Sequence, residues 1–176
     1  MTIEFKKWPK IPRLFNEEYS LTEKIDGSNA CIVIDEEGSI GAQSRNGLIA
    51  LHNDNFGFAQ WVIDNKDDLL QLGPGHHFGE WYGQGIQRNY GLSTRRFALF
   101  NYRIAELPKC VDIVPYLTNC SSENLFETIR ELYTDLKLHG SRAVHGFMNP
   151  EGLVIQSKLH GARYKVLYGT KGHVEE

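Results

Sequence analysis

The chain has 176 residues, the size of one domain or of one domain with a small annex, and its 41% hydrophobic content is enough for a proper core. No stretch approaches the roughly 18 consecutive apolar residues of a membrane span, and the first residues lack the apolar core of a signal peptide. The net charge of −3 and the pI of about 6.2 exclude a protein that coats nucleic acid, so any polynucleotide contact must be local and on a basic patch.

Residues 1–15 alternate basic and aromatic side chains, which indicates a lead-in strand that packs its aromatics or a contact for nucleic acid or triphosphate. Alternating apolar residues bounded by turn residues then predict a series of short strands. These strands cover residues 19–23, 30–35, 39–45, 76–82, 96–103, 152–156 and 163–168. Helices are expected over residues 52–65 and 121–139. Strands in adjacent pairs with two helices between them predict an α+β fold with mostly antiparallel sheets.

The helix expected over residues 121–139 has the clearest pattern in the chain. Ser121 or Ser122 can cap its start, and Gly140 ends it. Its apolar face consists of residues at helical spacing, namely Leu125, Ile129, Leu132 and Leu136. We interpret this helix as structural.

The most informative feature is the run from Lys24 to Asn29, which joins the first two expected strands. It places a lysine two residues before Asp26, which Gly27 follows at once. A lysine in this position can act as a covalent nucleophile. Attack on the α-phosphate of a nucleoside triphosphate would also require cations, oxygen ligands for a divalent metal and an aromatic face for the base.

Three residues between positions 45 and 100 are candidates for these tasks. Arg45 ends a hairpin strand and can hold a phosphate or the ribose, although Asn-Gly after it is also a common surface turn. Glu80 is the one acidic residue of an apolar and aromatic strand, where a carboxylate needs a metal, a ribose hydroxyl or a buried arginine as partner. Phe100 lies in a stretch that would ordinarily be plain core strand.

Three further candidates lie near the C-terminal end. Glu151 and Gly152 stand at the head of an apolar strand, where the glutamate is either functional or a loop-end residue in solvent. Arg163 and Lys165 share one face of a strand because side chains alternate with period two. Two cations on one face suit an α-phosphate, and the alternative is a solvated strand face.

In this order, the motifs resemble those of the covalent nucleotidyltransferases, the superfamily of ATP-dependent DNA ligases, RNA ligases and mRNA-capping enzymes. The resemblance runs from Glu23 to Lys165 and comprises K-x-D-G-x-N, Ser-Arg, F-G-E, an aromatic strand and E-G-h-V-h. A further motif of the family, usually K-x-K, corresponds here to Arg163-Tyr164-Lys165 and begins with arginine, and Asn101 stands where many relatives carry aspartate. The resemblance implies a ligase/capping-type adenylation domain, with antiparallel sheets flanked by helices and the nucleotide pocket between them.

The resemblance also implies a role for each motif. Lys24 would attack the α-phosphate of ATP to form lysyl-AMP, and Arg163 and Lys165 would steady that phosphate. Mg²⁺ or Mn²⁺ would be held, through waters, by Asp26, Glu80 and Glu151. The residues expected to bind the nucleotide are Glu23, Lys24, Asn29, Arg45, Glu80, Phe100, Glu151, Arg163 and Lys165.

Residues 1–176 are expected to form a single nucleotidyltransferase domain without a C-terminal OB-fold domain, because the chain ends eleven residues after Lys165. RNA ligases characteristically lack that domain, so the resemblance is closest to a minimal phage-type RNA ligase catalytic domain. Asp26 leaves the substrate type open. Some nick-sealing RNA ligases have histidine there, whereas DNA ligases, capping enzymes and other RNA ligases have aspartate.

The resulting hypothesis is an ATP-dependent RNA ligase that passes AMP to a 5′-phosphate end, which a 3′-hydroxyl then seals. The alternatives are a minimal DNA ligase, an adenylyltransferase that does not seal, a nucleotide-binding module, or a catalytic subunit that needs a separate substrate-binding partner. Three cysteines without metal-type spacing predict reduced thiols. We therefore expect a cytoplasmic protein, in the host cytoplasm if it is phage-encoded, with no membrane association.

Overall fold

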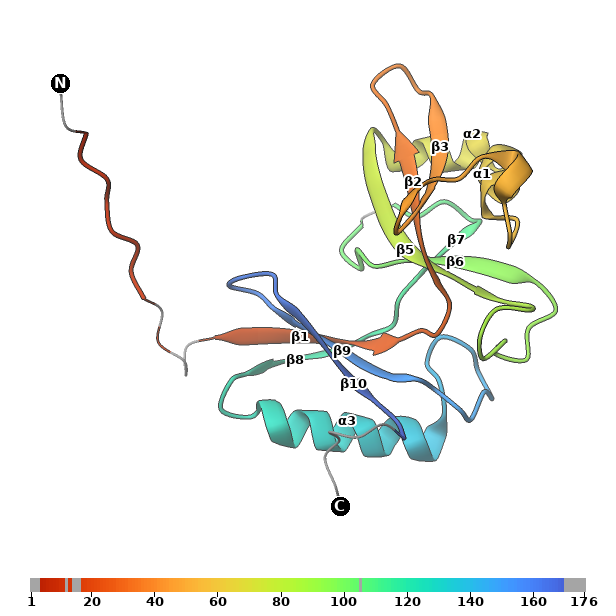
Figure 1. The fold of residues 1–176 in the computed structure, drawn as a ribbon. Coiled ribbons are helices and arrows are strands. Elements are labelled where there is room, and N and C mark those ends of the chain that lie inside the picture. The colour runs from red at the N-terminus through yellow and green to blue at the C-terminus, as the bar shows by residue number, and fades with distance from the viewer. Residues whose placement is uncertain (1–3, 12, 14–16, 105, 170–176) are drawn as a thin grey trace.

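The computed structural model describes residues 4–11, 13, 17–104 and 106–169, and the strands in this part form two sheets (Figure 1). Sheet A has the order β10-β9-β1-β8 and contains β1 (Glu18–Lys24), β8 (Tyr116–Ser121), β9 (Gly152–Ser157) and β10 (Arg163–Leu167). Sheet B has the order β4-β3-β2-β5-β6-β7 and contains β2 (Ser28–Ile34), β3 (Ile40–Ser44), β4 (Gly47–Leu48), β5 (Gly75–Gly83), β6 (Arg95–Leu99) and β7 (Val111–Ile113). All pairs are antiparallel except β6 with β7. The predicted α+β class is therefore confirmed.

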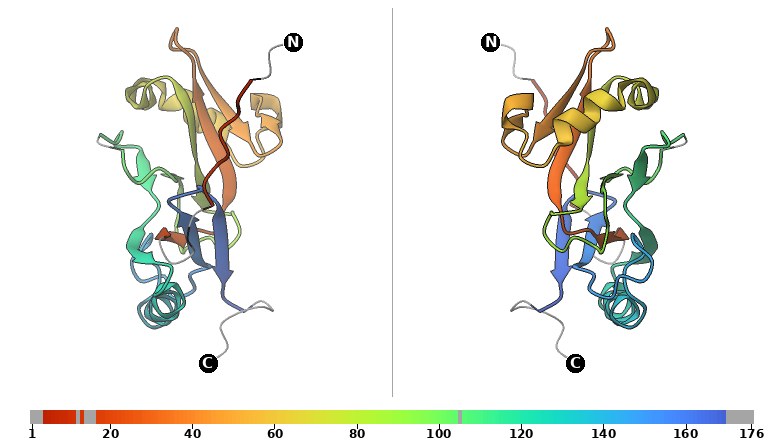
Figure 2. Two further views of the ribbon diagram at one scale, coloured as in Figure 1. Left: turned by 90° about the vertical axis from the view of Figure 1, so that its left-hand side faces the viewer. Right: turned by 90° about the vertical axis from the view of Figure 1, so that its right-hand side faces the viewer.

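Helices cover the outer face of each sheet (Figures 1 and 2). Helix α3 (Leu125–His139) packs its apolar face on sheet A, and the core between them is formed by Leu21, Ile129, Leu136, Leu153 and Ile155. Helices α1 (Phe58–Asp64) and α2 (Lys66–Leu69) lie on sheet B with the 3₁₀ turns Leu51–Asn53 and Leu70–Leu72. The faces of the two sheets that carry no helix line a cleft between the sheets.

The two sheets are joined closely at one end. Within residues 17–169 the chain passes between them twice, through residues 25–27 and through residues 114–115. Both passages are buried in one apolar cluster, made of Ile25, Tyr82, Tyr90, Ala98 and Val114. This junction fixes the end of β1 against sheet B.

Several predicted boundaries were wrong in the first half of the chain. The helix expected over residues 52–65 begins only at Phe58, because Asp54 turns back to accept hydrogen bonds from the N–H groups of Phe58 and Gln60. Gly57 precedes the helix with φ of 67°, a left-handed conformation that glycine adopts without strain. The strand expected over residues 96–103 ends at Leu99, and a turn follows at Phe100, whose carbonyl accepts a bond from the Tyr102 N–H.

Further differences lie between residues 111 and 125. Strands β7 and β8 were not predicted, and β8 includes Ser121, which we had expected at the start of the helix. Helix α3 begins at Leu125 with Asn124 at its N-cap, whereas its end at Gly140 agrees with the prediction. A Cβ at Gly140 would lie 2.6 Å from the carbonyl oxygen of Phe147, so the chain can pass closely here only because this residue is glycine.

The lead-in strand was also predicted incorrectly for its described part. Residues 4–11 form no strand, and Phe5 and Trp8 are exposed rather than packed, while Phe15 lies outside the described residues. All three cysteines are free thiols, as expected. None of the helices in the described part of the chain is long and apolar enough to cross a membrane.

Candidate active site

Lys24 is the last residue of β1 and lies at the junction of the two sheets. Its partner in the antiparallel ladder is Gly152, the first residue of β9. This register brings the lysine beside the preceding residue, Glu151, and the Nζ atom lies 2.5 Å from Oε2 of that glutamate. The pairing of β1 with β9 thus joins the K-x-D-G-x-N motif to the E-G-h-V-h motif.

The three-residue connection after Lys24 is held tightly against sheet B. A Cβ at Gly27 would lie 2.5 Å from the carbonyl oxygen of Trp81, so only glycine fits. The N–H of Gly27 donates to Oε1 of Glu80 at 3.1 Å. Asp26 lies beside the lysine but turns to Arg88, whose Nε is 2.9 Å from its Oδ2.

Glu80 lies on β5 and is only 6% exposed. Its second oxygen accepts a hydrogen bond from Nδ2 of Asn29 at 3.1 Å, and Oδ1 of Asn29 accepts one from Arg45. Burial raises the pKa of the Glu80 carboxyl to about 7, although the charge of Lys24 and the Gly27 N–H act in the opposite direction. Glu80 is therefore a carboxyl that changes charge near neutral pH inside the site.

Glu23 precedes the lysine on β1 and is 1% exposed. Its carboxylate accepts hydrogen bonds from Oγ of Ser141 at 2.5 Å and from the backbone N–H groups of Arg142 and Ala143 at 2.6 and 3.0 Å. Burial raises the pKa of this carboxyl against the effect of these bonds. The carboxylate of Glu23 thus holds the loop after α3.

A pocket of about 390 Å³ lies between the sheets beside Lys24. Seven of the predicted site residues line it, namely Glu23, Lys24, Asn29, Glu80, Phe100, Arg163 and Lys165. Phe100, which follows β6 of sheet B, and Val154 of sheet A give it apolar walls. The other three predicted residues, Asp26, Arg45 and Glu151, are not among the lining residues and are bonded to Arg88, Asn29 and Lys24, respectively.

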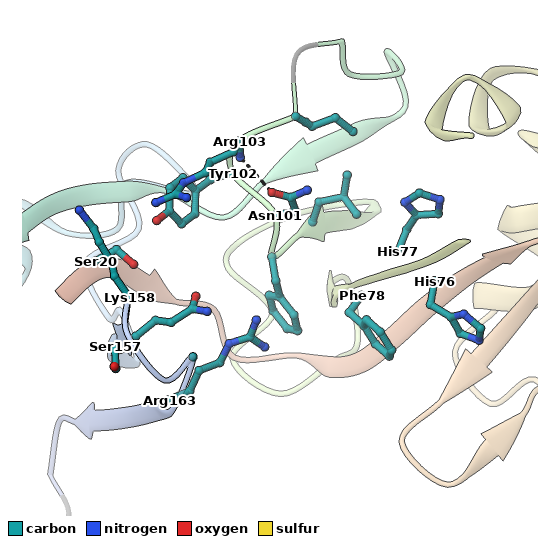
Figure 3. A pocket seen from close by; sticks show the side chains of 15 residues that line it. Ser20, His76, His77, Phe78, Asn101, Tyr102, Arg103, Ser157, Lys158 and Arg163 are labelled. Atoms are coloured by element: carbon teal, nitrogen blue, oxygen red, sulfur yellow. Dashed lines mark hydrogen bonds between the residues drawn. The ribbon is translucent and has the colours of Figure 1, made fainter. Parts of the chain in front are cut away.

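The two cations of β10 lie at different levels of this pocket. Lys165 pairs with Val154, which pairs with Thr22 of β1. Arg163 pairs with Gln156, which pairs with Ser20, four residues from Lys24 along β1. At about 3.3 Å per residue, Arg163 starts roughly 13 Å from the level of the nucleophile, and its long side chain lies in the cleft (Figure 3).

The described residues contain no group of three or more His, Cys, Asp or Glu side chains arranged to hold a metal ion. Asp26, Glu80 and Glu151 each have a partner in the protein. Mg²⁺ is commonly bound through one or two carboxylates together with substrate phosphates and waters. The three carboxylates do not form a preformed protein cage, and their chemistry fits a metal ion that keeps waters and phosphates among its ligands.

Sequence reasoning missed two residues that shape the site. Arg88 joins Asp26 to Asn149, since its Nη1 donates to Oδ1 of Asn149 at 3.0 Å. Tyr90 accepts a hydrogen bond from the Asp26 N–H at 2.8 Å. Both belong to a loop in which three non-glycine residues, Gln87, Asn89 and Tyr90, have positive φ. The glycines around this loop were the only signal in the sequence, and they do not identify the contacts.

Comparisons with known proteins find a family model that matches this chain and solved structures of similar fold. The RNA ligase family model matches residues 17–167. An archaeal ATP-dependent RNA ligase superposes with a TM-score of 0.63 at 18% identity, over 93% of this chain and 48% of that one. A Naegleria gruberi RNA ligase variant with ATP and Mn superposes with a TM-score of 0.62 at 21% identity, over 88% of this chain and 50% of that one. The comparison with curated proteins finds no match.

The chain spans about half the length of these solved structures. The structural likeness covers nearly all of this chain, so the expected adenylation-domain fold is confirmed. The motif-based resemblance is confirmed by the family match from Glu17 to Leu167, which includes every predicted site residue. This protein therefore belongs to the RNA ligase family.

Proposed function

We propose that the chain acts as a nucleotidyltransferase domain that performs ATP-dependent RNA ligation through a lysyl-AMP intermediate. The observation that carries the proposal is the position of Lys24, which lines a nucleotide-sized pocket together with Glu80, Phe100 and Lys165. Family membership supports the reaction class, and the Naegleria relative was solved with ATP and Mn.

In the first step, the Lys24 amine attacks the α-phosphorus of ATP. A nitrogen–phosphorus bond forms, the bond to the β-phosphate oxygen breaks, and pyrophosphate leaves. The ion pair between Lys24 and Glu151 must open before this attack, because a protonated amine held by a carboxylate has no free electron pair. A divalent metal would supply charge neutralisation on the phosphates, with Asp26, Glu80 and Glu151 as its carboxylates.

The rest of the pocket positions the nucleotide. Phe100 and Val154 are placed to enclose the adenine from opposite sheets. Lys165 lies closer to the level of Lys24 than Arg163 does, so we assign the α-phosphate contact to Lys165 first. Asn29 and Arg45, which are bonded to each other, are placed for the ribose or the phosphates.

In the second step, a 5′-phosphate oxygen of the polynucleotide attacks the lysyl-AMP phosphorus and regenerates the Lys24 amine. The product carries AMP in a 5′–5′ pyrophosphate linkage. In the third step, a 3′-hydroxyl attacks the polynucleotide phosphate, AMP leaves, and a phosphodiester closes the strand. RNA is the favoured polynucleotide because the family is that of RNA ligases.

The test is incubation with α-labelled ATP and Mg²⁺ or Mn²⁺, followed by denaturing electrophoresis and intact mass. We expect one AMP adduct on the wild-type protein and none on Lys24→Ala. No adduct on folded protein that is not already adenylylated would overturn the proposal. Labelled RNA ends without joined strands would instead support the adenylyltransferase alternative.

A further inference from the structure

Strand β5 carries an aromatic platform outside the nucleotide pocket. His76, Phe78 and Glu80 lie on the same face of β5 because side chains alternate along a strand. Glu80 lines the nucleotide pocket, whereas Phe78 lies about 6.6 Å further along and is 52% exposed. The rings of Phe78 and His76 stack, with centroids 6.0 Å apart and an interplanar angle of 20°. A polynucleotide that extends from the catalytic centre along β5 would thus meet two exposed rings, first Phe78 and then His76.

Two further pockets flank this platform and are lined by cations. Their volumes are about 410 and 250 Å³, and Phe78, Phe100 and Arg163 line both. Figure 3 shows Phe78 and His76 on one side of the larger pocket and Arg163 on the other, with its side chain extending toward Phe78. Arg103 and Lys158 also line this pocket, and the Lys158 amine is paired with Glu18 at 3.0 Å. No acidic residue is among those that line either pocket in the described part of the chain.

Exposed rings between cations match the way proteins bind single-stranded nucleic acid. Bases stack on aromatic side chains, and a positively charged groove follows the phosphates. Paired bases inside a duplex cannot offer their faces to Phe78. The net charge of −3 for the whole chain also requires that any such contact be local, and the two pockets beside Phe78, which no acidic residue lines, meet this requirement.

We infer that the cleft along β5 binds the unpaired nucleotides next to the 5′-phosphate end of a single-stranded RNA, with Phe78 as the main stacking residue. This inference rests on the proposed function for the identity of the end, and it deepens that function by specifying a single strand rather than a nicked duplex. Arg163 then contacts phosphates on the opposite wall of the cleft.

The experiment measures binding of the protein to a 12-nucleotide RNA by fluorescence anisotropy, without ATP. The RNA carries a 5′-phosphate and a 3′ fluorescent label. It is offered as a single strand and as the strand that supplies the 5′-phosphate in a nicked RNA duplex. The variants are Phe78→Ala, Phe78→Tyr and the control Phe126→Ala. Phe126 is 78% exposed on α3, on the other side of sheet A from the cleft. Circular dichroism verifies the fold of each variant.

We expect the wild type to bind the single strand more tightly than the nicked duplex. Phe78→Ala should weaken single-strand binding roughly fivefold or more, while Phe78→Tyr and Phe126→Ala stay close to the wild type. Unchanged binding in Phe78→Ala, tighter binding of the duplex by the wild type, or no measurable single-strand binding would each overturn the inference.

Adenylylation with labelled ATP is measured on the same preparations to separate the two proposals. Phe78-dependent RNA binding without adenylylation would contradict the proposed function and support the platform. Adenylylation without Phe78-dependent binding would contradict the platform alone.

Discussion

The Nζ atom of Lys24 lies 2.5 Å from Oε2 of Glu151, so the proposed nucleophile and a proposed metal ligand form an ion pair with each other. The pairing of β1 with β9 imposes this contact. The contact means that nucleotide binding must exchange one ion pair for contacts to phosphate and metal.

Glu151→Gln should therefore affect the metal requirement more than the fold. The amide keeps an acceptor for Lys24 but removes the charge that a divalent ion needs. We expect the Mg²⁺ concentration for half-maximal adenylylation to rise roughly tenfold or more, with a change in unfolding free energy of about 1 kcal/mol or less. Glu131→Gln, on the exposed side of α3, is the control. An unchanged Mg²⁺ titration would contradict the role of Glu151.

Glu80→Gln should change how stability depends on pH. The folded-state pKa of about 7 lies above the ordinary value of 4.5 because the carboxyl is buried. The contribution of Glu80 to stability is therefore fully present below pH 4.5 and is lost as the pH rises through 7. Between pH 5 and pH 8 the variant should gain roughly 2–3 kcal/mol relative to the wild type.

Urea unfolding at several pH values measures this difference. The exposed Glu36→Gln in the hairpin turn is the control and should show no such trend. A constant difference between wild type and Glu80→Gln across this pH range would exclude a raised pKa at Glu80.

Gly27→Ala should disturb the connection after the lysine. The added Cβ would lie 2.5 Å from the carbonyl oxygen of Trp81 and 2.9 Å from Cβ of Tyr82, and neither can move without shifting β5. We expect a loss of about 1–3 kcal/mol in unfolding free energy together with slower adenylylation. Gly41→Ala on β3, where a Cβ meets nothing within 4 Å, should leave both nearly unchanged. Equal behaviour of the two variants would contradict the close approach.

Glu23→Ala should lower the stability of the fold. Removal of the carboxylate leaves Oγ of Ser141 and the N–H groups of Arg142 and Ala143 without their buried acceptor. We expect a loss of roughly 3 kcal/mol in urea unfolding. Glu18→Ala, which breaks only the exposed ion pair with Lys158 on the same strand, should cost less than about 1 kcal/mol. A loss at Glu23 no larger than that at Glu18 would show that the buried bonds contribute little.

Local patterns in the sequence predicted most of the fold. Alternation identified the strands around Lys24, Glu80 and Glu151, and helical spacing identified the face of α3. Strand β8 was missed because its residues Thr118 and Asn119 do not alternate in polarity. It is a strand because it pairs with β1, and such long-range pairing leaves no local signal.

The order of motifs predicted which residues surround the pocket but not how they contact one another. Arg88 meets Asp26 only because a loop with three positive-φ residues folds back over the lysine connection. Period two placed Arg163 and Lys165 on one face, yet their levels along β1 depend on the register of the β9–β10 hairpin. Register is set by pairing between strands, so spacing within β10 could not reveal it.

The two passages between the sheets, residues 25–27 and 114–115, lie in one apolar cluster at one end of the cleft. They therefore act as a single hinge axis, about which any change in the angle between the sheets must turn. Points beside an axis travel least, so Lys24 stays nearly fixed when the walls part. Arg163 and Phe78 lie further from this axis and would move more than Lys24 does. Such an opening would widen the outer end of the cleft while the position of Lys24 changes least.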